Sequence, residues 1–191
     1  MPRLALTYII IHHTAAEERD TEQIRRYHMS KGWQDIGYDY VIERNGKTVE
    51  GRSLSIQGAH AGVQYFNQHA IGVAVIGNLS ARDIFPGQLN SLVELLAELV
   101  VKWRIPRDNI LLHREIKNTE CPGIRFPKNT ILELLKKKLP DSAIIDPGVP
   151  SEADTLVKLL QEEKKKNSAL EKENEIMKKA INQVRAIICE M

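Results

Sequence analysis

The chain has 191 residues, of which 42% are hydrophobic and 27% are charged, enough for one packed domain of ordinary size with some chain left over. This composition excludes disorder along the whole length. The formal net charge is only +2, so the protein lacks the large positive field that holds nucleic acid by neutralising its phosphates. We therefore expect no nucleic-acid partner.

The apolar segments are too short to cross a membrane, because none approaches the roughly 20 residues that a bilayer requires. The first 14 residues run into a strand-like segment and contain no hydrophobic stretch followed by a small-residue cleavage site. We expect no signal peptide, no membrane insertion and a cytoplasmic location. The two cysteines, Cys121 and Cys189, lie in very different sequence settings and do not indicate a disulfide framework.

The first predicted elements are a strand and a helix. Leu6–Ile11 is a β-branched and aromatic run, typical of a buried strand. Asp20 and Gln23 have the spacing of a capping box, in which two side chains satisfy the free N–H groups of a helix start. The spacing predicts a helix over residues 21–29.

A hairpin and a second buried strand follow. Asn45 and Gly46 tolerate a positive φ, which suits the tight turn of a hairpin between residues 38–43 and 47–50. Residues 71–76, Ile-Gly-Val-Ala-Val-Ile, are apolar throughout, which predicts another buried strand.

The last part of the domain contains a long amphipathic helix, a short strand at residues 110–112 and a helix over about 130–139. The long helix is predicted from apolar residues at helical spacing, namely Leu89, Leu92, Val93, Leu96, Leu99, Val100 and Trp103. Strands interleaved with helices, together with one local hairpin, predict an α/β fold in which a central mixed β-sheet is flanked by helices.

The composition changes sharply after this domain. Three prolines within residues 140–151 exclude a regular helix there, so we interpret the segment as a linker between a domain at 1–139 and a helical tail at 152–191. The tail follows a 4-3 spacing without a break: Leu156, Leu160, Glu163, Asn167, Leu170, Asn174, Met177, Ile181, Val184 and Ile188.

This heptad repeat predicts a coiled coil over residues 156–191. Asn167 and Asn174 fall at core a positions, where paired amides satisfy each other in a parallel dimer. Lys166 and Glu171 would attract each other across the same dimer. The alternative is a single amphipathic helix that folds back on its own domain.

The residues that could carry chemistry lie at strand ends and in one turn. His12 and His13 end the first strand, His113 ends the short strand, and Cys121 lies in a Thr-Glu-Cys-Pro-Gly turn. Most histidines in globular proteins are ordinary surface or core residues. Two imidazoles and one thiolate could nevertheless supply three ligands to zinc and leave a fourth position open, as in catalytic zinc sites.

Five sequence motifs carry a family resemblance. In order and spacing they closely resemble the motifs of the zinc-dependent N-acetylmuramoyl-L-alanine amidases of the type 2 superfamily, which includes phage lysozyme-like amidases and peptidoglycan recognition proteins. The resemblance covers roughly residues 5–139. The motifs are Ile9-Ile-Ile-His12-His-Thr-Ala, Gly32-Trp-Gln-Asp-Ile-Gly-Tyr38-Asp-Tyr, Gly58-Ala-His60-Ala, Ile71-Gly-Val-Ala-Val-Ile-Gly77-Asn and Leu112-His113 followed by Thr119-Glu-Cys121-Pro-Gly.

The resemblance implies a Zn²⁺ cofactor held by His12, His113 and Cys121. His13 is the rival for the first position, but successive side chains of a strand point to opposite faces, so only one of the pair can face a groove. In family members the ligand directly follows the apolar strand, which favours His12. We expect His13 to pack or to act behind the site.

The resemblance also implies roles for three further residues. Tyr38 falls on the family's catalytic tyrosine, and Thr119 falls where recognition-protein amidases carry threonine and phage lysozyme-like amidases carry lysine. His60 falls on a groove position that touches the muropeptide. The alternatives are a half-buried structural tyrosine for Tyr38 and a hydrogen-bonded loop histidine for His60.

The implied activity is hydrolysis of the amide bond between N-acetylmuramic acid and L-alanine in peptidoglycan by metal-activated water. The leading interpretation is a phage or prophage endolysin that stays in the cytoplasm until it is released to the cell wall at lysis. The alternatives are a cytoplasmic wall-recycling amidase and a non-catalytic peptidoglycan-binding module. Residues 52–55 lack the Gly-Trp pair that accompanies diaminopimelate preference, which leaves the preferred stem peptide open.

Overall fold

The computed structural model describes residues 3–139. The predicted linker at 140–151 and the predicted coiled coil at 152–191 lie outside these residues, and both stay predictions. None of the described helices is long and apolar enough to cross a membrane.

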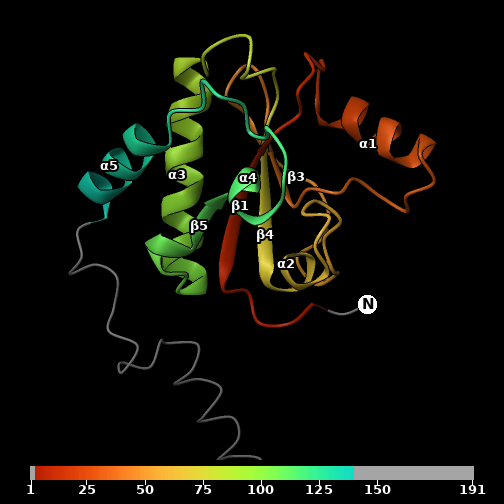
Figure 1. Ribbon diagram of the computed structural model, residues 1–191, viewed down its shortest axis with the longest axis horizontal. Helices are drawn as coiled ribbons and strands as arrows, with labels where there is room; N and C mark the ends of the chain where they lie inside the picture. Colours follow the sequence, from red (N-terminus) through yellow and green to blue (C-terminus); the bar gives the residue numbers. More distant parts are fainter. Residues whose placement is uncertain (1–2, 140–191) are drawn as a thin grey trace, which may run out of the picture. The chain divides into compact units, whose positions relative to one another are not determined.

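A five-stranded sheet forms the centre of the domain (Figure 1). The strand order is β3-β2-β4-β1-β5. β1 pairs in parallel with β4 and β5, β4 pairs in parallel with β2, and β3 pairs antiparallel with β2. The mixed sheet predicted from the sequence is therefore confirmed. The strands are β1 (Tyr8–His13), β2 (Tyr40–Ile42), β3 (Thr48–Glu50), β4 (Ala70–Val75) and β5 (Ile110–Leu112).

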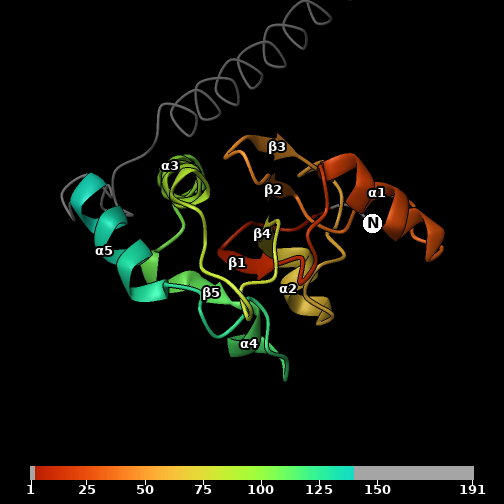
Figure 2. The ribbon, with the colours of Figure 1, turned by 90° about the horizontal axis from the view of Figure 1, so that it is seen from above.

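Helices flank both faces of the sheet. In Figure 2, α3 and α5 lie on one side of the strands and α1 and α2 on the other, while α4 lies beside the end of β5. The helices are α1 (Thr21–Ser30), α2 (Gln64–His69), α3 (Pro86–Trp103), α4 (His113–Ile116) and α5 (Lys128–Lys138), with a 3₁₀ turn at Arg107–Asn109.

The start of α1 shows half of the predicted capping box. The Asp20 carboxylate accepts a hydrogen bond from the Gln23 backbone N–H at 2.8 Å, as predicted. The Gln23 side chain accepts from the N–H of Arg19, at 2.9 Å, and not from that of Asp20. The helix still begins at Thr21, because the Asp20 cap alone satisfies one of its free donors.

The hairpin forms around the predicted turn, where Gly46 has a φ of +86°. β2 begins at Tyr40, two residues later than predicted, although the backbone N–H of the preceding Asp39 already donates to the carbonyl oxygen of Gly72 of β4 at 2.9 Å. The sequence also misses α2 and α4. Helices of six and four residues are too short to show a helical period in the sequence.

α3 covers the sheet with the predicted apolar face, with one exception. Leu92, Leu96 and Leu99 are fully buried, whereas Trp103 is 37% exposed at the last residue of the helix. Trp103 is thus less buried than the rest of the predicted apolar face, and it is the last residue of the helix.

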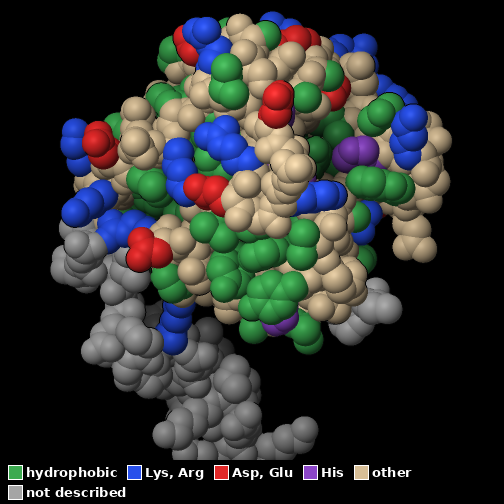
Figure 3. Space-filling model, in the orientation of Figure 1, with side chains coloured by type: hydrophobic (Ala, Val, Ile, Leu, Met, Phe, Trp, Pro, Cys, Tyr) green, Lys and Arg blue, Asp and Glu red, His purple; other side chains and the backbone are tan. Residues whose placement is uncertain are grey.

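The two faces of β1 have different surroundings. Ile9 and Ile11 belong to the large core between the sheet, α3 and α5. Ile10 and His12 have the opposite parity and so point toward the α1 and α2 side. Outside the core, charged side chains of both signs are interspersed over the face shown in Figure 3.

Neighbouring valines of α3 give a matched stability test. Val100 is 1% exposed and belongs to the core, and Val101 is 51% exposed on the same helix. Val100→Ala should lower the free energy of unfolding by about 2 to 3 kcal/mol, because it removes two buried carbons and leaves a cavity. Val101→Ala should change it by less than about 0.5 kcal/mol. Chemical denaturation of both variants measures the difference, and equal losses would contradict the assigned helix face.

Candidate metal centre and active site

The carboxyl ends of two parallel strands bring two histidines together. Ile11 of β1 pairs with Leu112 of β5, and His12 and His113 are the next residue of each strand path. The turn that follows α4 returns Cys121 to the same edge, where its Sγ accepts a hydrogen bond from the backbone N–H of His13 at 3.4 Å. Residues more than 100 positions apart in sequence therefore share one site.

His12, His113 and Cys121 form a group with the geometry of a metal site. One possible ligand atom from each residue lies within 4.8 Å of the other two. Cys121 Sγ is 3.7 Å from His12 Nδ1, close to the separation of about 3.5 Å that a nitrogen and a sulfur ligand have on one tetrahedral zinc ion. Two nitrogens and one sulfur leave a fourth position open, as catalytic zinc sites require.

The protonation of these residues also suits a cation. Burial is the main cause that lowers the pKa of His12 and of His113, so both rings are neutral and have a free lone pair. Burial raises the pKa of the Cys121 thiol to about 11. A bound divalent cation would reverse this last shift, because a coordinating thiol loses its proton.

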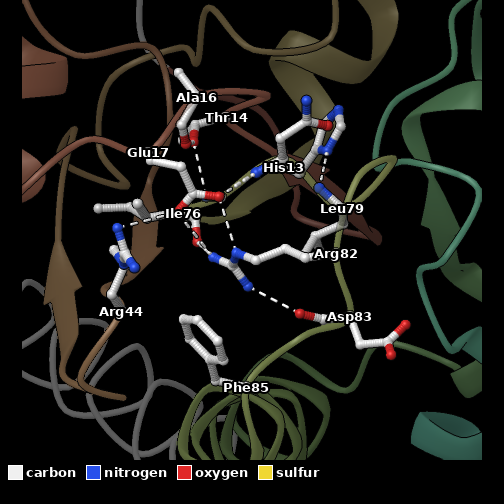
Figure 4. Close-up of polar contacts among 12 residues, drawn as sticks. His13, Thr14, Ala16, Glu17, Arg44, Ile76, Leu79, Arg82, Asp83 and Phe85 are labelled. Carbon is white, nitrogen blue, oxygen red and sulfur yellow. Dashed lines mark hydrogen bonds and ion pairs between the residues drawn. The ribbon is translucent and has the colours of Figure 1, made fainter.

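His13 points to the other side of the sheet from His12. Its Nδ1 accepts a hydrogen bond from the backbone N–H of Leu79 at 3.1 Å, as Figure 4 shows. It is not a member of the possible metal-binding group. These contacts agree with the expected alternation of the two neighbouring histidines.

A cavity of about 550 Å³ opens over this group. Every residue for which the sequence predicts a site role lines this cavity. Its lining is His12, His13, Ala15, Tyr38, His60, Asn78, Ser80, His113, Thr119, Glu120 and Cys121.

Tyr38 lies directly before β2 with its ring beside the candidate metal group. The centroids of the Tyr38 and His12 rings are 5.3 Å apart, and the Tyr38 ring also packs against a small core cluster that includes Ile24 and Ile36. Burial, with a smaller contribution from Cys121, raises the pKa of the Tyr38 hydroxyl. The hydroxyl therefore keeps its proton at neutral pH and can donate a hydrogen bond into the cavity.

Thr119 lines the cavity and also shapes the turn. Its Oγ1 accepts a hydrogen bond from the backbone N–H of Cys121 at 3.3 Å. The hydroxyl thus helps to fix the position of the thiol, while its own proton remains available to a group in the cavity.

His60 lies at the floor of the cavity but is enclosed by protein. Its side chain is 0% exposed, and its Nδ1 is 3.0 Å from Nε2 of His12. The structure thus gives the ring an internal partner, whereas the sequence predicts a contact with the muropeptide. The contact with the muropeptide stays a prediction, since His60 is also part of the cavity lining.

Asp39 lies behind His60, and its role was not predicted from the sequence. Its carboxylate is 0% exposed and accepts two hydrogen bonds from the Arg3 guanidinium, both at 2.9 Å. Burial raises the pKa of Asp39 to about 6, against the opposing effect of Arg3, so the carboxylate predominates at neutral pH. The sequence contains one signal for this role: Asp39 is an acidic residue between two tyrosines at the start of a predicted strand. A charge buried at such a position requires a partner.

The Arg82 side chain joins two loops beside the cavity. Figure 4 shows Arg82 between Glu17 and the carbonyl oxygens of Ile76 and Asp83. The Arg82 guanidinium also lies 4.0 Å from the centroid of the Phe85 ring. These contacts join the loop after β1 to the loop after β4, which carries the cavity residues Asn78 and Ser80.

Comparison with known proteins defines the class of this domain. The family model described as N-acetylmuramoyl-L-alanine amidase matches residues 2–124, and the chain belongs to this family. It is 37% identical over 128 residues to peptidoglycan-recognition protein SC2 of Drosophila melanogaster, a match that covers 62% of this chain and 68% of the relative.

Two further relatives are named as an endolysin and an amidase. The endolysin of Enterobacteria phage T3 is 30% identical over 130 residues, which cover 64% of this chain and 83% of that protein. The solved structure of the N-acetylmuramoyl-L-alanine amidase LysC from Clostridium intestinale is 32% identical, with a TM-score of 0.63 over 71% of this chain and 86% of that one. The family and these relatives support peptidoglycan hydrolysis.

Substitutions of Cys121 and of His13 should have different effects, the first on zinc content and the second on stability. Cys121→Ser should abolish the zinc binding that we expect of this group, because the group loses its sulfur atom. His13→Ala should retain about one zinc per chain but lose about 1 to 3 kcal/mol of stability, since the Leu79 N–H is left buried without an acceptor. His13→Asn should recover part of that stability, because its side-chain oxygen can accept the same bond.

Metal analysis and chemical denaturation check both effects. Loss of zinc from His13→Ala together with full zinc content in a His12→Ala variant would contradict the assignment of the two histidines.

Proposed function

We propose that this chain is a zinc-dependent N-acetylmuramoyl-L-alanine amidase that cleaves the amide bond between N-acetylmuramic acid and the L-alanine of the stem peptide. The single observation that carries the proposal is the group of His12, His113 and Cys121 at the floor of a cavity, in a chain of this amidase family. A bound zinc ion would make a water molecule more acidic and polarise the scissile carbonyl, which gives hydrolysis without a strong base.

The other cavity residues have roles that suit this reaction. Tyr38 would donate a hydrogen bond to the oxygen that becomes negative as the amide is attacked, because its hydroxyl is protonated and lies beside His12. Thr119 would contact the same tetrahedral species while it holds the turn of Cys121. Both residues would act by stabilising charge that develops in the transition state.

A second candidate function is binding of peptidoglycan without hydrolysis, which the similarity to peptidoglycan-recognition proteins favours. The resemblance drawn from the sequence implies that members which only bind lose a zinc ligand, often the cysteine. All three residues are present here and lie together. Hydrolysis is therefore the better proposal.

The biological setting that we propose is that of an endolysin, which degrades the wall when a phage lyses its host. The similarity to the endolysin of phage T3 supports this setting. A wall-recycling amidase would carry out the same cleavage on released fragments. Activity on intact wall distinguishes the two, because only an endolysin has to degrade it.

The direct test is mass spectrometry of the products formed from defined muropeptides. We expect separation of the sugar from an intact stem peptide that begins with L-alanine, loss of the reaction with a chelator, and recovery on addition of zinc. Unchanged muropeptide that still binds the protein would instead support the binding-only function.

A conservative variant tests the tyrosine. Tyr38→Phe removes one hydroxyl, so the fold and zinc content should be retained while turnover falls by roughly 10²- to 10³-fold. Tyr40→Phe is the matched control: Tyr40 is buried in β2 and is not part of the cavity lining, so its loss should leave turnover unchanged. Steady-state kinetics of the two variants give the comparison, and wild-type turnover in Tyr38→Phe would return this residue to a structural role.

The tail provides a separate proposal, a parallel dimer formed by residues 156–191. It rests on the heptad spacing and on Asn167 and Asn174 at a positions. Light scattering of the full chain should give the mass of two chains. Replacing both asparagines by isoleucine should raise the melting temperature of the assembly and broaden its oligomer distribution, because buried amides trade stability for a unique register. The mass of one chain at high concentration would contradict the dimer.

A further inference from the structure

The segment Gly58–Ala61, which lies outside the candidate metal group, contacts both of its histidines. Nε2 of His12 is 3.0 Å from Nδ1 of His60, and Nε2 of His113 is 2.9 Å from the carbonyl oxygen of Ala61. One short loop thus occupies the Nε2 atom of each ring. The Nδ1 atoms remain as the only nitrogens of these rings that can bind a metal.

The Ala61 contact fixes the proton of His113. A carbonyl oxygen accepts hydrogen bonds and cannot donate, so Nε2 of His113 must carry the hydrogen. In the neutral ring the lone pair is then on Nδ1. This side of the site therefore has one possible tautomer.

The His12 contact alone does not settle which ring donates, but the charge of Asp39 favours one assignment. Nε2 of His60 is buried, has no hydrogen-bond partner among the described residues, and lies 4.0 Å from Oδ2 of Asp39. A hydrogen on Nε2 would face this carboxylate, so the charge of Asp39 favours the neutral ring with its hydrogen there. Nδ1 of His60 then has the lone pair, and it accepts the hydrogen bond from Nε2 of His12.

The outer part of this arrangement is rigid. Arg3 holds both oxygens of Asp39, and Oδ2 also accepts a hydrogen bond from the N–H of Gly72 at 2.7 Å. A Cβ atom at Gly72 would lie 2.4 Å from the His60 ring, and one at Gly58 would lie 2.7 Å from it. The two glycines therefore leave room for an imidazole that has almost no freedom to move.

The loop itself is fixed by one side chain of α2. Oδ1 of Asn67 accepts hydrogen bonds from the backbone N–H groups of His60 and Ala61, at 3.0 and 2.9 Å. Asn67 thus holds together the two contacts that orient the histidines.

We propose that His60 is a positioning residue for the metal site: it accepts a hydrogen bond from Nε2 of His12 and so presents Nδ1 of His12 to the metal, while the Ala61 carbonyl does the same for His113. The inference rests on the proposed zinc site. It gives His60 a role within the protein, distinct from the contact with the muropeptide that the sequence predicts. Partners of this kind, behind the ligands, typically change metal affinity by about 10- to 100-fold when they are removed.

A matched pair of variants isolates the hydrogen bond. Asparagine and leucine have nearly the same shape, but only asparagine has an acceptor oxygen close to the place of Nδ1 in histidine. His60→Leu should weaken zinc binding by about 10- to 100-fold, and His60→Asn should recover most of that loss. Competition with a chelator of known affinity measures both, and thermal melting of the metal-free proteins compares their folds.

Equal zinc affinity in wild type and both variants would overturn the proposal, and so would equal losses in the two variants. These results differ from failure of the proposed function, in which the wild-type protein binds no zinc.

Nitrogen NMR of the zinc-loaded wild-type protein tests the same assignment without a substitution, which covers a variant that does not fold. We expect metal-bound Nδ1 and protonated Nε2 in both His12 and His113, and a hydrogen on Nε2 of His60. Zinc on Nε2 of His12, or a hydrogen on Nδ1 of His60, would overturn the inference.

Discussion

The parallel pairing of β1 with β5 is the constraint on which the rest of the site depends. Side chains of neighbouring parallel strands stand beside each other, so His12 and His113 meet at the carboxyl edge once Ile11 is paired with Leu112. A shift of one residue in β1 would turn His12 into the core and bring His13 to the cavity side. In the observed register Ile9 and Ile11 pack in the core under α3, and Ile10 is buried on the opposite face. The register of β1 therefore decides which histidine faces which side.

The polar residues behind the site follow from a second constraint, the cost of burying charge and polar atoms without partners. Asp39 is enclosed, and its charge is compensated by the paired Arg3 guanidinium and the Gly72 N–H. His60 is likewise enclosed, with His12 in contact with its Nδ1 and the Asp39 carboxylate 4.0 Å from its Nε2. The fold brings Arg3, near the N-terminus, and Gly72, in β4, into contact with Asp39 and His60. These distant residues therefore determine the orientation of the His60 ring. A site with such support needs little rearrangement when it binds a cation.

The sequence could predict the parts of this structure that have a local cause. Ile110–Leu112 was predicted with its observed limits, and Asp20 and Gly46 marked the start of α1 and the hairpin turn, because caps and turns depend on neighbouring residues. The motifs singled out six residues that line one cavity. The enclosed state of His60 could not be predicted, since it depends on Arg3, Asp39 and Gly72, which are distant in the sequence and come together only through the order of the strands. α2, whose Asn67 fixes the loop of His60, is too short to have a periodic signal.

His12 and His13, adjacent at the end of β1, have different roles because their side chains point to opposite faces of the sheet. His12 points to the cavity side, where burial keeps its ring neutral and a loop occupies its outer nitrogen. His13 points to the α3 side, where it accepts from Leu79 at the start of the loop that carries Ser80. The backbone of His13 meanwhile donates to Cys121. One residue would thus contribute to the chemistry directly, while its neighbour connects β1 to two surrounding segments, the loop of Leu79 and the turn of Cys121. Exchanging the two roles would require a shift of the whole strand by one residue. The alternation of a β-strand, a purely local property, therefore decides which of two identical side chains can serve a metal.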